Sequence, residues 1–236
     1  MPYYYYYIDP TYVLVLIGVV ICLIASAGVK STFSKYSQYR SMSGMTGAQA
    51  AERILNAAGI YDVTIQHISG NLTDHYNPSQ KTLNLSDSVY SANSVAAIGV
   101  AAHECGHAIQ HKEGYAPLSL RTAIVPVANI GSTLSWPLIL IGLLFTRNTG
   151  TFFINLGIIC FSFAVIFQLV TLPVEFNASS RALRMLGTQG ILSDSELPYT
   201  RKVLKAAAMT YVASAASGIL QLFRLILLFG GRNRDD

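Results

Sequence analysis

The sequence predicts a mainly α-helical integral membrane protein with three to four transmembrane helices and a small α+β region. Of its 236 residues, 52% are hydrophobic and only 12% are charged, about half the charge of an ordinary soluble domain. The apolar residues gather in runs long enough to approach or cross the thickness of a bilayer. These runs cover residues 12–29, 123–145, 152–172 and 206–229, and a polar stretch, 30–122, separates the first two.

The first apolar run, residues 12–29, is typical of an uncleaved membrane anchor. Five tyrosines at positions 3–7 precede it, and Tyr is enriched where a helix meets the membrane surface. No Lys or Arg precedes the run, whereas Lys30, Lys35 and Arg40 follow it. A signal peptide carries its positive charge first, and charge that follows a span favours the cytoplasmic side. We therefore expect the N-terminus outside and the polar region inside the cell.

The polar region begins with a predicted helix and a predicted sheet. Residues 47–59 place small and apolar side chains on one face at helical spacing. Residues 63–68 and 82–86 alternate between apolar and polar side chains, which is typical of half-buried strands. Because a turn-rich stretch separates these two segments, we expect a short hairpin or a small sheet.

A second helix of the polar region carries the most informative motif, His-Glu-Cys-Gly-His at 103–107. Ser94 suits the N-cap of this helix, which we expect to run to about Lys112 and to stop near Gly114. Positions i and i+4 of a helix lie on one face, so the two histidines of the motif point the same way.

Two histidines with this spacing can bind one zinc ion, and the glutamate between them is placed to take a proton from a zinc-activated water. In this chain these residues are His103, His107 and Glu104. Two surface histidines on a helix are the alternative where such a short motif stands alone. A catalytic zinc site also needs a third protein ligand. The choice between a zinc site and two surface histidines therefore depends on whether the rest of the sequence supplies that ligand.

Glu175 is the expected third ligand. His111 shares a helix face with His103 and His107, but it lies a further ~6 Å along the axis, so we do not expect it to reach the ion. Glu175 follows the third apolar run and lies just after Pro173, which suits the first turn of a new helix. Carboxylates near a membrane boundary are few, although a helix N-terminus also favours one for purely structural reasons.

The predicted topology supports this choice, because runs 123–145 and 152–172 form a transmembrane hairpin. Two crossings return the chain to the side from which it came, so Glu175 can meet the two histidines. The distribution of basic residues agrees with this hairpin. Only Arg147 lies at its turn, and the others flank it at Lys112, Arg121, Arg181 and Arg184.

The fourth run, 206–229, is less clean, because Gln221 and Arg224 interrupt it. It either crosses the bilayer or packs against the site at one end. For this reason the sequence predicts three to four spans in total.

The three cysteines, Cys22, Cys105 and Cys160, predict neither a disulfide framework nor a metal ligand. Two of them lie in apolar runs, where a free Cys behaves as a small hydrophobe. Cys105 occupies a variable position of the motif, and we expect it to face away from the two histidines. The basic residues form no nucleic-acid-binding face, so no nucleic-acid partner is expected.

The chain resembles the YugP-like membrane zinc metallopeptidases in the order of its features. From the N-terminus these are residues 72–78, the motif at 103–107, the two-span hairpin, residues 175–179 and the closing residues 220–231. It is more distantly similar to the HtpX-like and CAAX-processing membrane peptidases, which use a glutamate as third ligand. Those relatives usually carry Asp where this chain has Ser179. A hydroxyl can still bond an imidazole N–H, but it lacks the charge that raises the basicity of the ligand.

The resemblance implies a zincin-like catalytic region and a zinc-dependent endopeptidase of the gluzincin type. The resemblance implies no particular substrate; we expect membrane or membrane-proximal proteins and peptides, with the lipid bilayer as the other partner. The site would consist of one Zn²⁺ per chain on His103, His107 and Glu175, with Glu104 as general base.

Two parts of such a site stay open. Zincins commonly align substrate along an edge strand, and residues 82–86 are a candidate, beside the reading as an ordinary structural strand. An additional donor for the oxyanion is usual, and His75, Tyr76 and Tyr211 are the candidates.

We expect a single functional unit built from four stretches, in a multi-pass protein of the cell membrane with its active site on the cytoplasmic side. The stretches are the N-terminal region with the first transmembrane helix (1–29), the catalytic region (30–122), the transmembrane hairpin (123–172), and the third-ligand helix with the C-terminal hydrophobic helix (173–236).

The main alternative is a non-catalytic membrane scaffold that retains a structural metal site. The intact Glu104 argues against it, because a structural site has no use for a base between its ligands. A transporter or channel would carry paired ionisable residues at mid-depth, and the first three apolar runs contain none.

Overall fold

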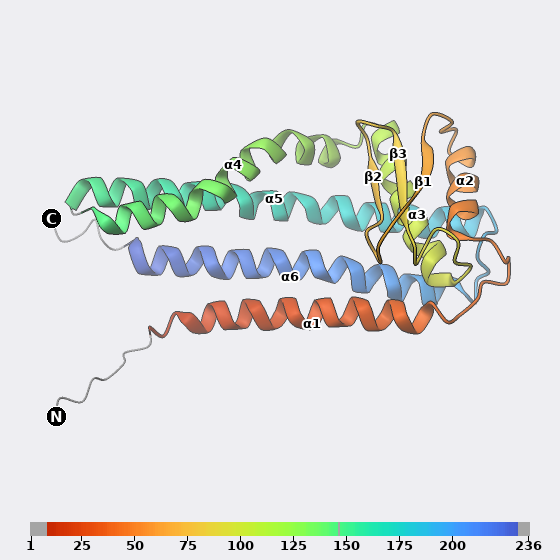
Figure 1. Ribbon diagram of the computed structural model, residues 1–236, viewed down its shortest axis with the longest axis horizontal. Helices are drawn as coiled ribbons and strands as arrows, with labels where there is room; N and C mark the ends of the chain where they lie inside the picture. Colours follow the sequence, from red (N-terminus) through yellow and green to blue (C-terminus); the bar gives the residue numbers. More distant parts are fainter. Residues whose placement is uncertain (1–8, 146, 231–236) are drawn as a thin grey trace, which may run out of the picture. The chain divides into compact units, whose positions relative to one another are not determined.

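The computed structural model of the chain describes residues 9–145 and 147–230 (Figure 1); the tyrosines at 3–7 lie outside the described residues. The chain divides into two compact units. The first unit consists of Met1–Ile24, Ala123–Val170 and Tyr211–Asp236, and the second of Ala25–Thr122 and Thr171–Thr210.

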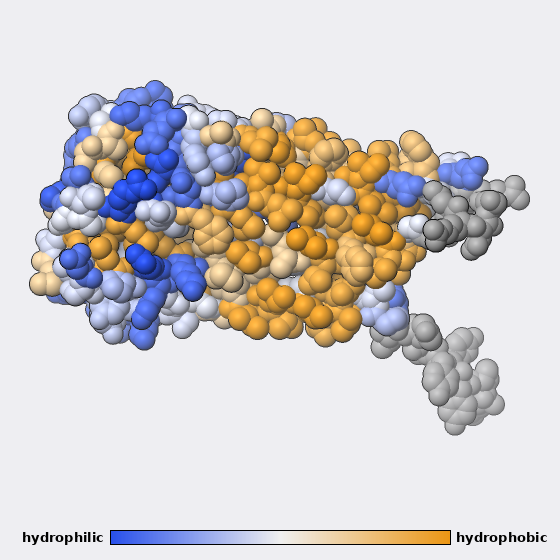
Figure 2. Space-filling view, turned by 180° about the vertical axis from the view of Figure 1, so that it is seen from behind, coloured by the Kyte–Doolittle hydropathy of each residue, from blue (hydrophilic) through white to orange (hydrophobic). Residues whose placement is uncertain are grey.

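Four helices are long and apolar enough to cross a membrane in the described part of the chain. They are α1 (Tyr12–Tyr36), α4 (Ala116–Leu144), α5 (Arg147–Thr188) and α6 (Leu197–Phe229). Hydrophobic side chains cover much of the surface of these long helices, whereas hydrophilic ones gather over the part that contains the sheet (Figure 2). Large hydrophobic side chains such as Leu16, Ile24 and Leu140 are exposed on these helices. Such an exposed apolar surface is favourable in contact with lipid and unfavourable in water.

Arg224, which interrupts the fourth apolar run, is compensated inside the first unit. Its Nη2 lies 3.8 Å from a carboxylate oxygen of Asp9, and its Nε donates a hydrogen bond of 3.2 Å to the hydroxyl of Thr11. The guanidinium also lies 4.3 Å from the ring centre of Tyr12. A membrane-spanning helix tolerates a cation that is paired in this way. Helix α6 is therefore the fourth candidate span.

The expectation that Pro173 begins a new helix is wrong, because α5 continues through it without interruption to Thr188. A proline inside a helix removes one backbone donor, and long membrane helices tolerate this loss because neighbouring groups satisfy the freed carbonyl. Glu175 therefore lies on the same helix as the third apolar run and not on a separate one.

The second unit contains a three-stranded sheet in the order β1–β3–β2. β3 (Thr82–Ser86) pairs parallel with β1 (Thr64–Ile68) and antiparallel with β2 (His75–Asn77). The small sheet is confirmed, but the two strands expected as a hairpin run parallel, and β2 was missed because it has three residues within a turn-rich stretch. As the middle strand, β3 has no free edge for a substrate, and the edge strand beside helix α3 is β2.

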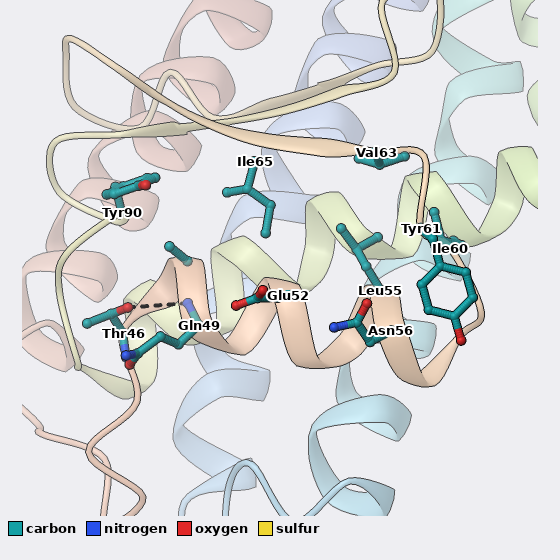
Figure 3. Close-up of a pocket in the computed structure, with 11 residues that line it drawn as sticks. Thr46, Gln49, Glu52, Leu55, Asn56, Ile60, Tyr61, Val63, Ile65 and Tyr90 are labelled. Atoms are coloured by element: carbon teal, nitrogen blue, oxygen red, sulfur yellow. Dashed lines mark hydrogen bonds between the residues drawn. The ribbon is translucent and has the colours of Figure 1, made fainter.

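Helix α2 (Gly47–Ala57) is fixed at its start by a capping box. The Thr46 hydroxyl accepts from the backbone N–H of Gln49, whose side chain accepts from the N–H of Thr46, so two orphan donors are satisfied. Figure 3 shows this cap beside a hollow of about 570 Å³ between α2 and β1. Glu52 is the one carboxylate that lines this hollow, and no His or Cys does.

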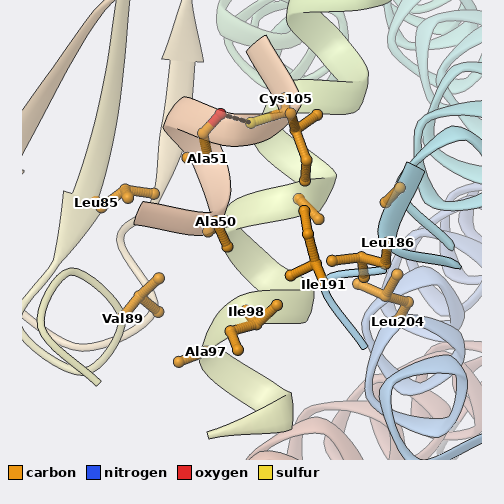
Figure 4. Packing of buried hydrophobic residues seen from close by; sticks show 14 of the residues in the cluster. Ala50, Ala51, Leu85, Val89, Ala97, Ile98, Cys105, Leu186, Ile191 and Leu204 are labelled. Carbon is orange, nitrogen blue, oxygen red and sulfur yellow. Dashed lines mark hydrogen bonds between the residues drawn. The ribbon is translucent and has the colours of Figure 1, made fainter. Parts of the chain in front are cut away.

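Helix α3 (Val95–Lys112) carries the motif and has the predicted boundaries. The Ser94 hydroxyl accepts from the N–H of Ala97 at 3.1 Å, and Gly114 has a φ of +61°, a conformation that suits Gly after a helix end. The small side chains of α3 are buried in the core of the unit, between α2 and β3 on one side and Leu186, Ile191 and Leu204 on the other (Figure 4).

The backbones of α3 and α5 touch at one glycine. A Cβ added to Gly106 would lie 2.5 Å from the carbonyl oxygen of Ala178, so any larger residue forces the two helices apart. This contact sets the distance between the face of α3 that carries the motif and the part of α5 that carries Glu175.

We expect Gly106→Ala to lower the melting temperature of the detergent-purified chain, because overpacking of this kind costs about 1–3 kcal/mol. The matched control is Gly28→Ala in α1, where no atom lies within 4 Å of the added Cβ and where Ala favours the helix. Thermal unfolding that is the same for Gly106→Ala and wild type would contradict the tight contact.

Candidate metal centre

Three side chains converge in the second unit: His103 and His107 from α3 and Glu175 from α5. Their ligand atoms all lie within 4.8 Å of one another. Oε2 of Glu175 is 3.2 Å from Nε2 of His103 and 3.7 Å from Nε2 of His107. Two ligands bonded to one tetrahedral zinc at about 2.0–2.1 Å are about 3.3 Å apart, so the spacing suits a single zinc ion.

The histidine pair has this geometry because the two residues lie one turn apart on α3. Their rings meet edge to face, with centroids 4.8 Å apart. Glu175 is almost completely buried, with 2% of its surface exposed. An isolated buried carboxylate is costly, and here it faces groups that favour its charge.

The ring of His107 is oriented by Gln110, which lies one turn further along α3. Nε2 of Gln110 donates to the carbonyl of Val174 at 2.8 Å and to Oδ1 of Asn177 at 3.0 Å. The amide oxygen of Gln110 must therefore be the atom 3.0 Å from Nδ1 of His107, and it accepts a hydrogen bond there. With Nδ1 as the donor, Nε2 of His107 is free to bind a metal.

Ser179 orients the second imidazole in the same way. Its hydroxyl lies 3.1 Å from Nδ1 of His103, which leaves Nε2 of that ring toward Glu175. The bond that a hydroxyl at this position was expected to make is thus present. Both imidazoles present Nε2 to the same carboxylate oxygen, and the donor set of two imidazoles and one carboxylate fits zinc.

The other oxygen of Glu175 faces Arg121. Nη1 of Arg121 lies 3.6 Å from Oε1 of Glu175, so one side of the carboxylate faces a cation and the other side faces the two imidazoles. In the sequence, Arg121 was interpreted only as a sign of membrane topology, and its place beside Glu175 was missed. Nothing in a single sequence links residues 121 and 175.

Glu104 is buried on α3, and its Oε2 accepts a hydrogen bond of 2.9 Å from the backbone N–H of Tyr76. This bond joins the motif helix to the edge strand β2. Burial raises the pKa of the nearby Asp74 above its ordinary value, and Asp74 accepts hydrogen bonds from the N–H and the hydroxyl of Ser86. Asp74 thus holds the chain before β2 against β3.

The carboxylates of Glu175 and Glu104 raise the pKa of the His107 imidazole. Burial opposes a positive charge on its ring, but the interaction with Glu175 and the charge of Glu104 raise the pKa of His107 above its ordinary value. Surroundings that stabilise an imidazolium also stabilise a metal cation on the same nitrogen.

His111, which was considered as a ligand, and the three candidate oxyanion donors, His75, Tyr76 and Tyr211, are not part of the three-residue cluster. The hydroxyl of Tyr76 lies 2.9 Å from Nδ1 of His111. In His75, Nδ1 donates to the carbonyl of Thr73 and Nε2 accepts from the amide of Asn84. Tyr211 falls in the first unit, and the choice of an oxyanion donor stays a prediction.

Cys105 faces α2 and not the histidines. It is buried, and its thiol donates to the carbonyl of Ala51 at 3.6 Å (Figure 4). Burial raises the pKa of this thiol well above its ordinary value, which disfavours the thiolate that a metal needs.

Comparison with known proteins agrees with the resemblance seen in the sequence. A family model described as "Putative neutral zinc metallopeptidase" matches residues 11–230. The chain is 47% identical over 208 residues to "Putative membrane protease YugP" of Bacillus subtilis (strain 168), which covers 88% of this chain and 91% of that protein. No solved structure is significantly similar to the chain. Because the family model spans nearly the whole chain, this membrane protein belongs to the family of neutral zinc metallopeptidases.

Proposed function

We propose that the chain is a zinc-dependent membrane endopeptidase of the gluzincin type, with one Zn²⁺ per chain on His103, His107 and Glu175. The observation that carries the proposal is the convergence of two Nε2 atoms on one oxygen of a buried carboxylate. Gln110 and Ser179 support it, since each holds the opposite ring nitrogen. A chance pair of surface histidines would have no reason to be held in this way.

Glu104 is the general base in this proposal, on a zincin-like motif helix. Zinc, when bound, supplies a Lewis acid that polarises the scissile carbonyl and makes water more acidic. Glu104 takes a proton from the attacking water and passes it to the leaving amine. Arg121 is a positioning residue, because it faces the carboxylate oxygen of Glu175 that points away from the imidazoles.

We propose that a substrate segment pairs with the edge strand β2. His75, Tyr76 and Asn77 all pair with β3 in register, and the N–H of Tyr76 donates to Glu104. Main-chain pairing along this edge would bring an extended peptide past the base. Such binding needs extended backbone rather than a particular side chain, so it favours protein or peptide substrates with an unfolded stretch near the membrane.

The site belongs, in this proposal, on the cytoplasmic side of a multi-pass protein of the cell membrane. Lys30 and Lys35 lie in the last two turns of α1 and Arg40 follows that helix, whereas Arg147 is the first residue of α5, at the other end of the hairpin helices. This asymmetry supports a cytoplasmic second unit. The catalytic region at 30–122 and the third-ligand stretch after 172 then act as one functional unit.

Removal of a ligand should remove the metal. We expect elemental analysis of detergent-purified protein to find about one zinc per chain in wild type, as three protein ligands imply, and far less in His103→Ala and Glu175→Ala. His67→Ala is the matched control, because His67 is exposed and pairs with Asp87 outside the site. Zinc that is unchanged in Glu175→Ala would overturn the third ligand, and a wild type that takes up no zinc on reconstitution would overturn the site.

Removal of the base should leave the metal in place. Glu104→Gln keeps an oxygen that can accept from the N–H of Tyr76, so we expect normal zinc content with cleavage of an unfolded protein lowered about 10²- to 10⁴-fold. Glu52→Gln, an exposed carboxylate on α2, should cleave like wild type. A Glu104→Gln variant that keeps most of its activity is incompatible with the assigned role.

The hydroxyl of Ser179 should tune zinc affinity. Ser179→Ala removes the acceptor for Nδ1 of His103, and we expect zinc to bind about 10- to 100-fold more weakly in competition with a chelator. Ser179→Asp supplies a charged acceptor at the same place and should bind zinc at least as tightly as wild type. Equal affinity in all three proteins would mean that Ser179 does not position His103.

A further inference from the structure

A groove in the second unit, formed by α5 and α6, combines an apolar lining with positive charge. Its volume is about 620 Å³. The apolar part of the lining includes Phe176, Leu183 and Leu204, and the cationic part consists of Arg184, Arg201 and Lys205. On each helix these residues recur at spacings of three and four, so the groove is formed by one face of each helix.

The cations of this groove are not neutralised by the protein. In the described residues, no ion pair involves Arg184, Arg201 or Lys205. A neighbouring hollow of about 450 Å³ shares Arg201 and Lys205 and adds Lys202. Asp194 is the one carboxylate that lines either cavity, so the charge that faces the solvent here is strongly positive.

Glu196, the other carboxylate of this part of the chain, is engaged elsewhere. It accepts hydrogen bonds from the N–H of Met42 at 2.7 Å and from the N–H and hydroxyl of Ser193. These bonds lower the pKa of Glu196 below its ordinary value, against the effect of burial. Its charge therefore serves the turn before α6 and not the cations of the groove.

The groove begins where the apolar parts of both helices end. The third apolar run ends at residue 172, and Phe176 follows after about 6 Å of helix rise. The fourth run starts at residue 206, next to Lys205. Membrane topology explains the sign of the charge at such a boundary, but it does not explain why three unpaired cations line one cavity together with apolar side chains.

We propose that this groove binds an anionic membrane phospholipid. Its phosphate lies among Arg184, Arg201 and Lys205, because guanidinium groups donate two parallel hydrogen bonds to phosphate oxygens. The glycerol and the first methylenes of its acyl chains cover Phe176, Leu183 and Leu204. Basic pockets between membrane helices bind anionic head groups by this combination of charge and apolar surface.

Ser179 connects the groove to the metal centre. It is part of the groove lining, and its hydroxyl contacts Nδ1 of His103. A bound lipid would thus restrict the helix face that orients a metal ligand. This consequence rests on the proposed function, whereas lipid binding itself can be tested without any activity.

The test is native mass spectrometry of the full-length, detergent-purified chain titrated with phosphatidylglycerol, phosphatidylcholine or inorganic phosphate. We expect selective retention of phosphatidylglycerol. Arg201→Gln/Lys205→Gln should weaken this binding roughly 30-fold, because each basic residue near the head group contributes about one kcal/mol. Lys30→Gln/Lys35→Gln is the matched control, since it removes two exposed charges at the C-terminal end of α1 that lie outside the groove.

Equal weakening in the two double variants would overturn the site, because it would reduce the effect to general surface charge. Equal retention of phosphatidylcholine would remove the role of the cations. Binding of inorganic phosphate as tightly as the lipid would replace the proposed ligand by a free anion. Arg184→Gln gives an independent check if the double variant fails to fold.

Discussion

The close contact between α3 and α5 is the constraint on which the rest of the site depends. Gly106 brings the backbone of the motif helix against the carbonyl of Ala178, three residues after Glu175. Only at this separation can two imidazoles from one helix and a carboxylate from the other share a single ion. The apolar core of the second unit maintains the contact, with the small residues of α3 buried on several sides. Packing of small side chains therefore positions the three proposed metal ligands.

The hydrogen bonds around the ligands depend on the same contact. Gln110 bonds His107 and, at the same time, the backbone and side chain of α5, and Ser179 of α5 bonds His103. Each bond crosses between the two helices, so a shift of one helix would disturb both imidazoles and the carboxylate together. Arg121 completes the arrangement at the far oxygen of Glu175. A site that is held from both helices loses little conformational entropy when a ligand or ion binds.

Much of this arrangement could be predicted from the sequence, wherever the signal was local or periodic. The motif helix has its predicted start at Ser94 and its end before Gly114, because capping residues and helical spacing are local properties. Glu175 lies beside the two histidines, as we predicted from the order of the apolar runs. The parallel pairing of β1 with β3 was not predicted, since β2 has three residues and gives no periodic signal. Pro173 was misread as a helix start because the proline rule for soluble helices does not hold along a membrane helix. Arg121 was missed because its contact with Glu175 depends on tertiary packing alone.

The most direct test of the site is X-ray absorption at the zinc edge of the purified, zinc-loaded protein. We expect only nitrogen and oxygen neighbours of the zinc, at about 2.0–2.1 Å, with the outer-shell scattering of two imidazole rings. A sulfur neighbour at about 2.3 Å would implicate a cysteine and contradict the assignment of Cys105 to the core. Scattering from three imidazoles would show that a further histidine takes the place of Glu175.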